Sequence, residues 1–93
     1  MLVIIKSAPG TPEGKRGIKL ARDMAADVCL MQNAVYFAHD ERLEGFCGAV
    51  YVLDDDCTLR GLSDSRLKKS IKKLDYDSLV DVIVNEDKII KAF

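Results

Sequence analysis

The stretches "VCLMQNAVYFA", Val28 to Ala38, and "YVLDDDCTLRGL", Tyr51 to Leu62, decide the fold of this chain. In each, a short apolar run typical of a buried strand leads into polar residues and the start of a helix. The predicted strands are Val28 to Met31 and Ala49 to Leu53. Strands joined by helical crossovers are typical of a parallel sheet. The pattern therefore predicts a small α/β domain.

The rest of the chain continues this alternation. It predicts a first strand, a first helix, a fourth strand and a last helix, at Leu2 to Ile5, Pro12 to Ala26, Ile71 to Leu74 and from Asp75 or Asp77 onward. The closing segment "KIIKAF" is apolar enough to pack back on the chain or to contact a neighbouring molecule. Because helical crossovers cover both faces of a parallel sheet, we expect a three-layer α/β/α fold with a mostly parallel sheet of about four to five strands. With no repeat or linker, residues 1–93 are expected to form a single domain.

Small polar residues and glycine mark the expected helix ends. Thr11 has the position of an N-cap for the first helix. Asn33 is expected to cap a short helix from Ala34 to about Asp40. Asp54 is expected to cap a second short helix, which Gly61 ends.

Size and composition limit the classes of function. A chain of 93 residues leaves about a third of its unfolded surface exposed, so burial in an oligomer would help it. Its formal net charge of -1 gives no electrostatic basis for binding a nucleic acid directly. The apolar run at Leu2 to Ile5 is far shorter than a signal-peptide core, and no stretch approaches the roughly 20 apolar residues that span a bilayer. We expect a cytoplasmic protein without a membrane partner.

The three cysteines are candidates for chemistry. Cys29, Cys47 and Cys57 have no CxxC spacing, and the chain has one histidine, so we expect free thiols, no metal site and no cofactor. Cys29 lies within an apolar strand, where a thiol stays protonated and inert. Cys47 precedes a glycine where a loop meets a strand and is expected to be more accessible.

Cys57 is the sharpest candidate nucleophile. It occupies the first turn of a predicted helix, whose dipole lowers the pKa of a thiol. The carboxylates of Asp54 to Asp56 oppose that effect. Leu53 and Cys57 are also spaced so as to share one inward face. Cys57 is therefore either a packed core residue or a catalytic thiol.

A second candidate is a site for a small anion. "GTPEGKR", Gly10 to Arg16, resembles a phosphate-binding loop, but its glycine spacing is one residue short and Arg16 stands where a Ser or Thr is required. The exposed amides of a helix N-terminus can still hold an anion. Asn33 follows the second strand, at the edge where open α/β sheets place ligands. Thr11, Lys15 and Asn33 are the candidate anion-binding residues, with helix capping as the alternative role of Asn33.

Three motifs in order resemble a known family. "LMQNAVYFA" is similar to a strand followed by a Gln-Asp/Asn-Gly-Val turn, with Ala34 in place of the glycine. "VYVLDDDCTLRGL" resembles a strand with an acidic pair, Arg-Gly and Leu, and "LDYDSLVDVIVNEDKIIKAF" resembles the closing strand and helix. The family is the DsrH/TusB branch of the DsrE/DsrF/DsrH-like sulfur-relay proteins, and the resemblance covers most of the chain.

This resemblance implies a subunit of a sulfur-relay complex. Related α/β subunits in such complexes pass persulfide sulfur between cysteines, toward tRNA 2-thiouridine or toward sulfur oxidation. The implied partners are DsrE/TusD-like and DsrF/TusC-like subunits and, through the complex, a sulfur-carrier protein. Some relatives have a cysteine in the first helix, but Pro12 to Ala26 has none, and Cys57 stands where the family usually has an apolar residue.

Three functional hypotheses follow. The first is a structural, non-catalytic subunit that supports sulfur transfer by packing against its partners. The second is a persulfide carrier that uses Cys57, with Cys47 as the next candidate. The third is a homodimer that stands alone and binds a small anion near Ser7 to Thr11 and Asn33.

Overall fold

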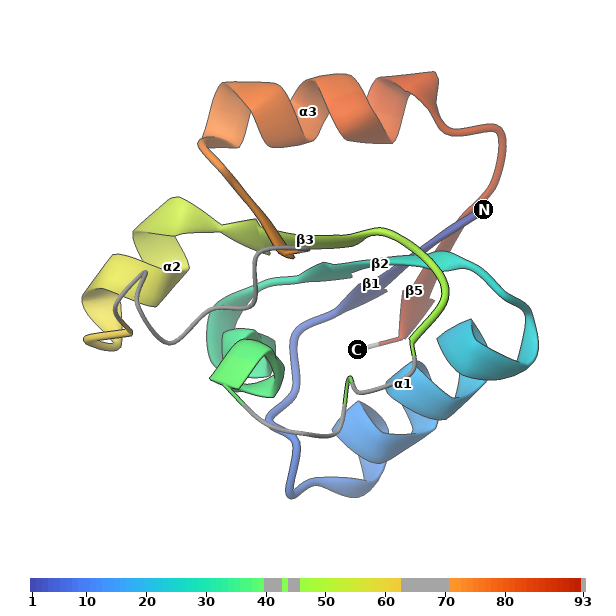
Figure 1. The fold of residues 1–93 in the computed structure, drawn as a ribbon, viewed down its shortest axis with the longest axis horizontal. Coiled ribbons are helices and arrows are strands. Elements are labelled where there is room, and N and C mark those ends of the chain that lie inside the picture. The colour runs from blue at the N-terminus through green and yellow to red at the C-terminus, as the bar shows by residue number, and fades with distance from the viewer. Residues whose placement is uncertain (40–42, 44–45, 63–70, 93) are drawn as a thin grey trace.

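A computed structural model describes residues 1–39, 43, 46–62 and 71–92. Within these residues the chain alternates between strands and helices, with one segment in the tighter 3-10 form (Figure 1). The elements are β1 (Leu2–Ile5), α1 (Pro12–Asp23), β2 (Asp27–Leu30), the 3-10 helix η1 (Gln32–His39), β3 (Val50–Leu53), α2 (Asp54–Leu59), β4 (Ile71–Leu74), α3 (Tyr76–Asn85) and β5 (Ile89–Ala92).

The strands form one parallel sheet in the order β4-β3-β2-β1-β5. Figure 1 shows α3 on one face of this sheet and α1 on the other. The structure confirms the expected three-layer α/β/α fold. The closing segment packs back on the chain, because β5 pairs with β1 at the edge of the sheet.

Alternate residues of the strands belong to two separate hydrophobic cores, one on each face of the sheet. In β1, Val3 and Ile5 join the larger core, which contains residues of α1 and η1. Leu2 and Ile4 point to the other face and pack with Leu79 of α3. This is the period-2 alternation of a strand that is buried on both faces.

The N-cap predicted at Thr11 is confirmed, and of the two predicted starts of the last helix, Asp75 and Asp77, Asp75 is the cap. The Thr11 hydroxyl oxygen accepts a hydrogen bond from the Gly14 amide at 3.1 Å. The Asp75 carboxylate accepts one from the Ser78 amide at 2.8 Å. Each side chain satisfies an amide that has no partner within its helix.

The end of α1 differs from the prediction. The helix ends at Asp23 rather than Ala26, because Ala25 adopts a left-handed conformation with φ of 50°. The Ala26 amide then donates to the carbonyl of Ala21 at 2.9 Å, and the Ala25 amide to that of Arg22 at 3.2 Å. These two bonds form a Schellman motif, in which the residue with the left-handed conformation is usually glycine. Alanine fills the glycine position here, so the sequence gives no sign of the turn.

The caps predicted at Asn33 and Asp54 are wrong. Asn33 lies inside η1, which already begins at Gln32. Asp54 is the first residue of α2, and the N-cap position belongs to Leu53, which makes no side-chain cap. Both short helices follow their strands with at most one residue between, so the polar side chains bond to neighbouring elements instead. Asp54, for example, forms an ion pair with Lys73 of β4 at 3.0 Å.

Gly61 ends α2 as predicted. Its φ is 70°, in the left-handed region that favours glycine. The Leu62 amide donates to the Cys57 carbonyl at 2.9 Å, and the Gly61 amide donates to that of Thr58 at 3.1 Å.

Across the described ranges of the chain, no helix is both long and apolar enough to cross a membrane.

Candidate functional site

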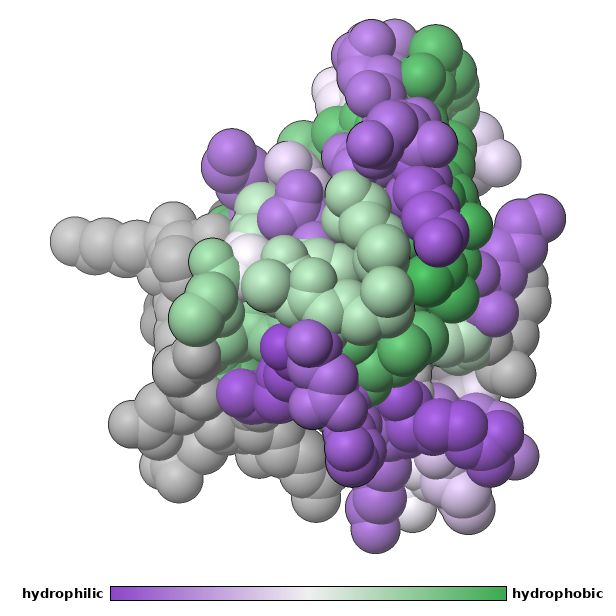
Figure 2. Space-filling model, turned by 90° about the vertical axis from the view of Figure 1, so that its right-hand side faces the viewer, coloured by the Kyte–Doolittle hydropathy of each residue, from purple (hydrophilic) through white to green (hydrophobic). Residues whose placement is uncertain are grey.

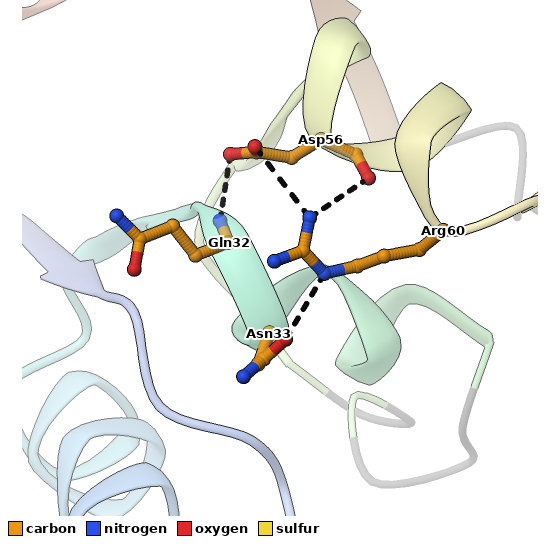
Figure 3. A network of polar contacts seen from close by, with 4 residues as sticks. All are labelled: Gln32, Asn33, Asp56 and Arg60. Atoms are coloured by element: carbon orange, nitrogen blue, oxygen red, sulfur yellow. Dashed lines mark hydrogen bonds and ion pairs between the residues drawn. The ribbon is translucent and has the colours of Figure 1, made fainter.

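Polar side chains connect η1 and α2 where β2 and β3 end. Asp56 of α2 and Arg60, which caps the end of that helix, point toward Gln32 and Asn33 (Figure 3). The Gln32 amide donates to Oδ2 of Asp56 at 2.6 Å. The Nε of Arg60 donates to Oδ1 of Asn33 at 3.1 Å. Two sequence stretches 24 residues or more apart are joined in this way at the carboxyl edge of the sheet.

Asp56 also holds Arg60 in place. The Nη1 of Arg60 lies 3.6 Å from Oδ1 of Asp56 and donates to the Asp56 backbone carbonyl at 3.3 Å. Each side chain keeps only 17% of its surface exposed. The cation and the anion therefore neutralise each other within the site, and its main effect is to fix α2 against η1.

Two of the three predicted anion-binding residues, Thr11 and Asn33, have side-chain partners within the chain. Besides accepting from Gly14, the Thr11 hydroxyl donates to the Ala8 carbonyl at 2.7 Å. Asn33 accepts from Arg60, and Lys15 is exposed on α1. Thr11 thus stabilises the turn before α1, and Asn33 helps to hold η1 against the end of α2.

Cys57 is fully buried in the larger core. A donor molecule cannot reach its thiol while the chain is folded. The shared inward face expected for Leu53 and Cys57 is wrong, because Leu53 belongs to the smaller core on the opposite face of the sheet. Leu53 is the last residue of β3, so the helical spacing used in that prediction does not apply to it.

Cys29 is also fully buried, in the smaller core. Burial raises the pKa of its thiol from 9.0 to about 12, and the negative charge of Asp56 adds to the effect. A thiol with this pKa stays protonated at neutral pH and is a poor nucleophile. This burial agrees with the core position expected from the sequence.

Cys47 is the exposed cysteine. It lies at a hollow of about 110 Å³, which is lined by Ala21, Arg22, Ala25, Phe46, Cys47 and Gly48. The Arg22 guanidinium carbon lies 5.7 Å from the centre of the Phe46 ring, a cation-π distance. Sequence reasoning identified Cys47 as accessible but missed the hollow, because α1 and residues 46–48 meet only in the folded chain.

A larger hollow lies between α1 and β5. Its volume is about 250 Å³, and it is lined by Glu13, Arg16, Gly17, Leu20, Ile90, Lys91 and Ala92. No local pattern predicted this hollow, since β5 was not predicted as a strand. No cluster of three or more His, Cys, Asp or Glu side chains that could hold a metal ion occurs in the described ranges.

Comparisons with known proteins agree with the fold and the motifs. The "ychN protein from E.coli" has a crystal structure that matches with a TM-score of 0.73 and 17% sequence identity, over 97% of this chain and 96% of that one. No curated protein matches the sequence significantly. A family model described as "DsrH like protein" matches residues 15–89. This match spans most of the chain and agrees with the resemblance of its motifs, so the chain belongs to the DsrH-like family.

Proposed function

We propose that this chain is a non-catalytic subunit of a sulfur-relay complex, in which it packs against DsrE-like and DsrF-like subunits. Membership of the DsrH-like family supports a place in sulfur relay. The pathway would be tRNA 2-thiouridine formation or sulfur oxidation, in the cytoplasm.

The burial of Cys29 and Cys57 is the observation that supports a structural role for this chain. Sulfur relay needs a thiolate that a donor persulfide can reach. Cys29 and Cys57 have no exposed surface, and the pKa of Cys29 is raised to about 12. Helix α1, where some relatives have a cysteine, contains none. These facts count against Cys29 and Cys57 as carriers and favour a partner subunit as the place where sulfur is carried, with exposed Cys47 as the alternative on this chain.

The test is purification of the chain with its complex at native expression, followed by mass spectrometry of intact complexes and of labelled persulfides. Related α/β subunits in fixed stoichiometry, with no added sulfur on this chain, are the expected result. Recovery of a homo-oligomer alone would overturn the proposal. Cys47→Ser and Cys57→Ser variants should keep full relay activity.

A persulfide carrier is the second candidate, and the exposure of Cys47 favours it. In that reaction the Cys47 thiolate attacks the outer sulfur of a donor persulfide and releases the donor thiolate. A partner thiolate then takes the outer sulfur and restores the Cys47 thiolate. Added mass of one sulfur on Cys47, together with loss of relay in Cys47→Ser, would replace the structural proposal with this one. Cys57→Ser is the matched control, because Cys57 is buried.

The third hypothesis, an anion-binding homodimer, is tested by titration calorimetry with sulfate and thiosulfate. Thr11 and Asn33 already make hydrogen bonds to other residues of the chain. We therefore expect no heat of binding. Binding that Lys15→Ala and Asn33→Ala abolish would support the homodimer instead.

A further inference from the structure

Helix α3 carries apolar side chains on its outer surface as well as toward the sheet. Leu79 is buried in the smaller core, and Val82 and Ile83 pack against it. Tyr76, Val80 and Val84 follow one another at intervals of four residues and are 61%, 42% and 73% exposed. Residues four apart lie on the same side of a helix, so these three form one stripe, named here the α3 stripe. Figure 2 shows strongly hydrophobic surface next to hydrophilic surface at the top of the molecule, where α3 lies.

The sheet face beneath α3 is thinly covered. Parallel sheets are normally buried on both faces. On this face α3 packs over the sheet, and the apolar side chains around the smaller core are only partly buried: Met31, Tyr51, Leu74 and Ile89. The larger core on the other face is covered by α1 and η1 together. The α3 stripe therefore adds exposed apolar surface on the less covered side of the sheet.

The charged side chains of helix α3 itself have one sign. Asp77 and Asp81 are exposed on the same helix. Glu86 and Asp87, just after the helix, form ion pairs with the amino group of Met1 at 2.9 and 3.5 Å, so Asp77 and Asp81 are the negative charges that α3 offers beside the stripe. Two copies that paired through this surface would bring like charges together, which is unfavourable. A partner with positive charge at the margin of an apolar contact would instead be attracted.

We propose that the α3 stripe binds a second protein whose contact surface carries apolar side chains bordered by lysine or arginine. The inference rests on the proposed function, because the partner is then another subunit of the relay complex. The apolar side chains supply the buried contact area, while Asp77 and Asp81 meet the basic border and set the orientation.

The experiment uses the full chain and the DsrE-like and DsrF-like proteins of the same organism, purified together. Val84→Asp places a charge in the α3 stripe at its most exposed position. Leu59→Asp is the matched control, since Leu59 is an apolar residue of α2 that is 80% exposed. Circular dichroism checks that both variants fold. We expect Val84→Asp to weaken the complex at least about tenfold and Leu59→Asp to leave its dissociation constant unchanged.

The outcomes separate this inference from the proposed function. If the unchanged chain forms no complex with these proteins, the proposed function and the inference both fail. A complex that forms equally well with Val84→Asp overturns the inference alone. A homodimer of the isolated chain that Val84→Asp abolishes would make a second copy the occupant and would also overturn it.

A charge variant tests the basic border of the partner. Asp81→Lys should weaken the complex, and raising the salt concentration should weaken the complex of the unchanged chain, because salt screens charges near a surface. Asp55→Lys on α2 is the control, since Asp55 is also an exposed helical aspartate. A complex that is insensitive to salt and to Asp81→Lys would exclude the basic border.

Discussion

The carboxylate of Asp56 accepts a hydrogen bond from the backbone amide of Gln32 at 2.6 Å, so that α2 provides the cap for the start of η1. Gln32 has a φ of 50°, a conformation that a residue with a side chain rarely adopts. The bond holds Gln32 in this conformation at the point where β2 turns into η1. Asp56 also holds Arg60, which reaches Asn33 in η1.

Asp56→Ala should therefore destabilise the fold. The variant leaves the Gln32 amide without its acceptor and Arg60 without its counter-ion, and we expect a loss of about 1–3 kcal/mol in the free energy of unfolding. Urea unfolding followed by circular dichroism measures it. Asp55→Ala is the control, because Asp55 shares the favourable helix dipole but is exposed. Equal effects of the two substitutions would show that the dipole, not the bond to Gln32, explains the loss.

Gly14→Ala is predicted to destabilise the chain, although alanine favours helices. A Cβ at Gly14 would lie 2.2 Å from the backbone oxygen of Ala8. That oxygen accepts bonds from the hydroxyl and the amide of Thr11, so it cannot move away without loosening the cap of α1. The gain in helix propensity of about 1 kcal/mol is then outweighed, and the melting temperature falls.

The control for this substitution is Gly10→Ala. Gly10 is exposed, and a Cβ there meets nothing within 4 Å. Its melting temperature should stay within a few degrees of that of the unchanged chain. A rise in melting temperature for Gly14→Ala would mean that the loop before α1 yields easily, which contradicts the tight contact.

Local sequence signals were sufficient for most of the fold. Apolar runs predicted β1 and β4 with their observed bounds, and the caps at Thr11 and Asp75 depend only on residues within the next helical turn. Alternating strands and helices then restrict the chain to a layered parallel sheet. Helical spacing predicts one shared face for Leu79, Val80, Ile83 and Val84, but this prediction is only half right. Leu79 and Ile83 pack toward the sheet, whereas Val80 and Val84 are 42% and 73% exposed.

Features that depend on contacts far apart in the sequence could not be predicted. Asn33 and Asp54 are residue types that often cap helices. In the folded chain Asn33 instead bonds to Arg60, and Asp54 pairs with Lys73. The turn at Ala25 has no glycine to signal it. Burial of Cys57 depends on the packing of η1 and α1 over the sheet, which its own helix does not reveal.

The cap at Asp75 gives a prediction about acid. Hydrogen bonds from the backbone amide and the side chain of Ser78 lower the pKa of Asp75 from 3.8. The folded state therefore favours the carboxylate, and the stability it contributes is present above pH 3.8 and lost as the pH falls through the lowered value. Asp75→Asn should melt at a lower temperature than the unchanged chain at pH 7, and the difference should shrink toward pH 3.

The matched control is Asp77→Asn, in the first turn of the same helix. It removes a carboxylate without removing the bond to Ser78. If the two variants show the same difference at pH 7 and the same change with acid, the cap at Asp75 contributes no more than an exposed charge near the helix dipole.

The Cys29 thiol predicts a loss of stability in alkali. Its pKa is 9.0 when exposed and about 12 in the folded chain, because burial disfavours the thiolate. Between these values the unfolded chain releases a proton that the folded chain keeps, so this contribution to stability is complete below pH 9 and falls as the pH rises toward 12. The slope is about 1.4 kcal/mol for each pH unit. Cys29→Ala removes the titrating group and leaves a small cavity, whose cost in stability does not change with pH.

The measurement is urea unfolding from pH 8 to 10.5. The free energies of unfolding of the unchanged chain and of Cys29→Ala, plotted against pH, should converge. Cys47→Ala is the control, because it removes an exposed cysteine and keeps the buried Cys29 thiol, so it should lose stability in alkali as the unchanged chain does. Parallel curves for Cys29→Ala as well would mean that water reaches Cys29, and the burial of the smaller core would then be incomplete in solution.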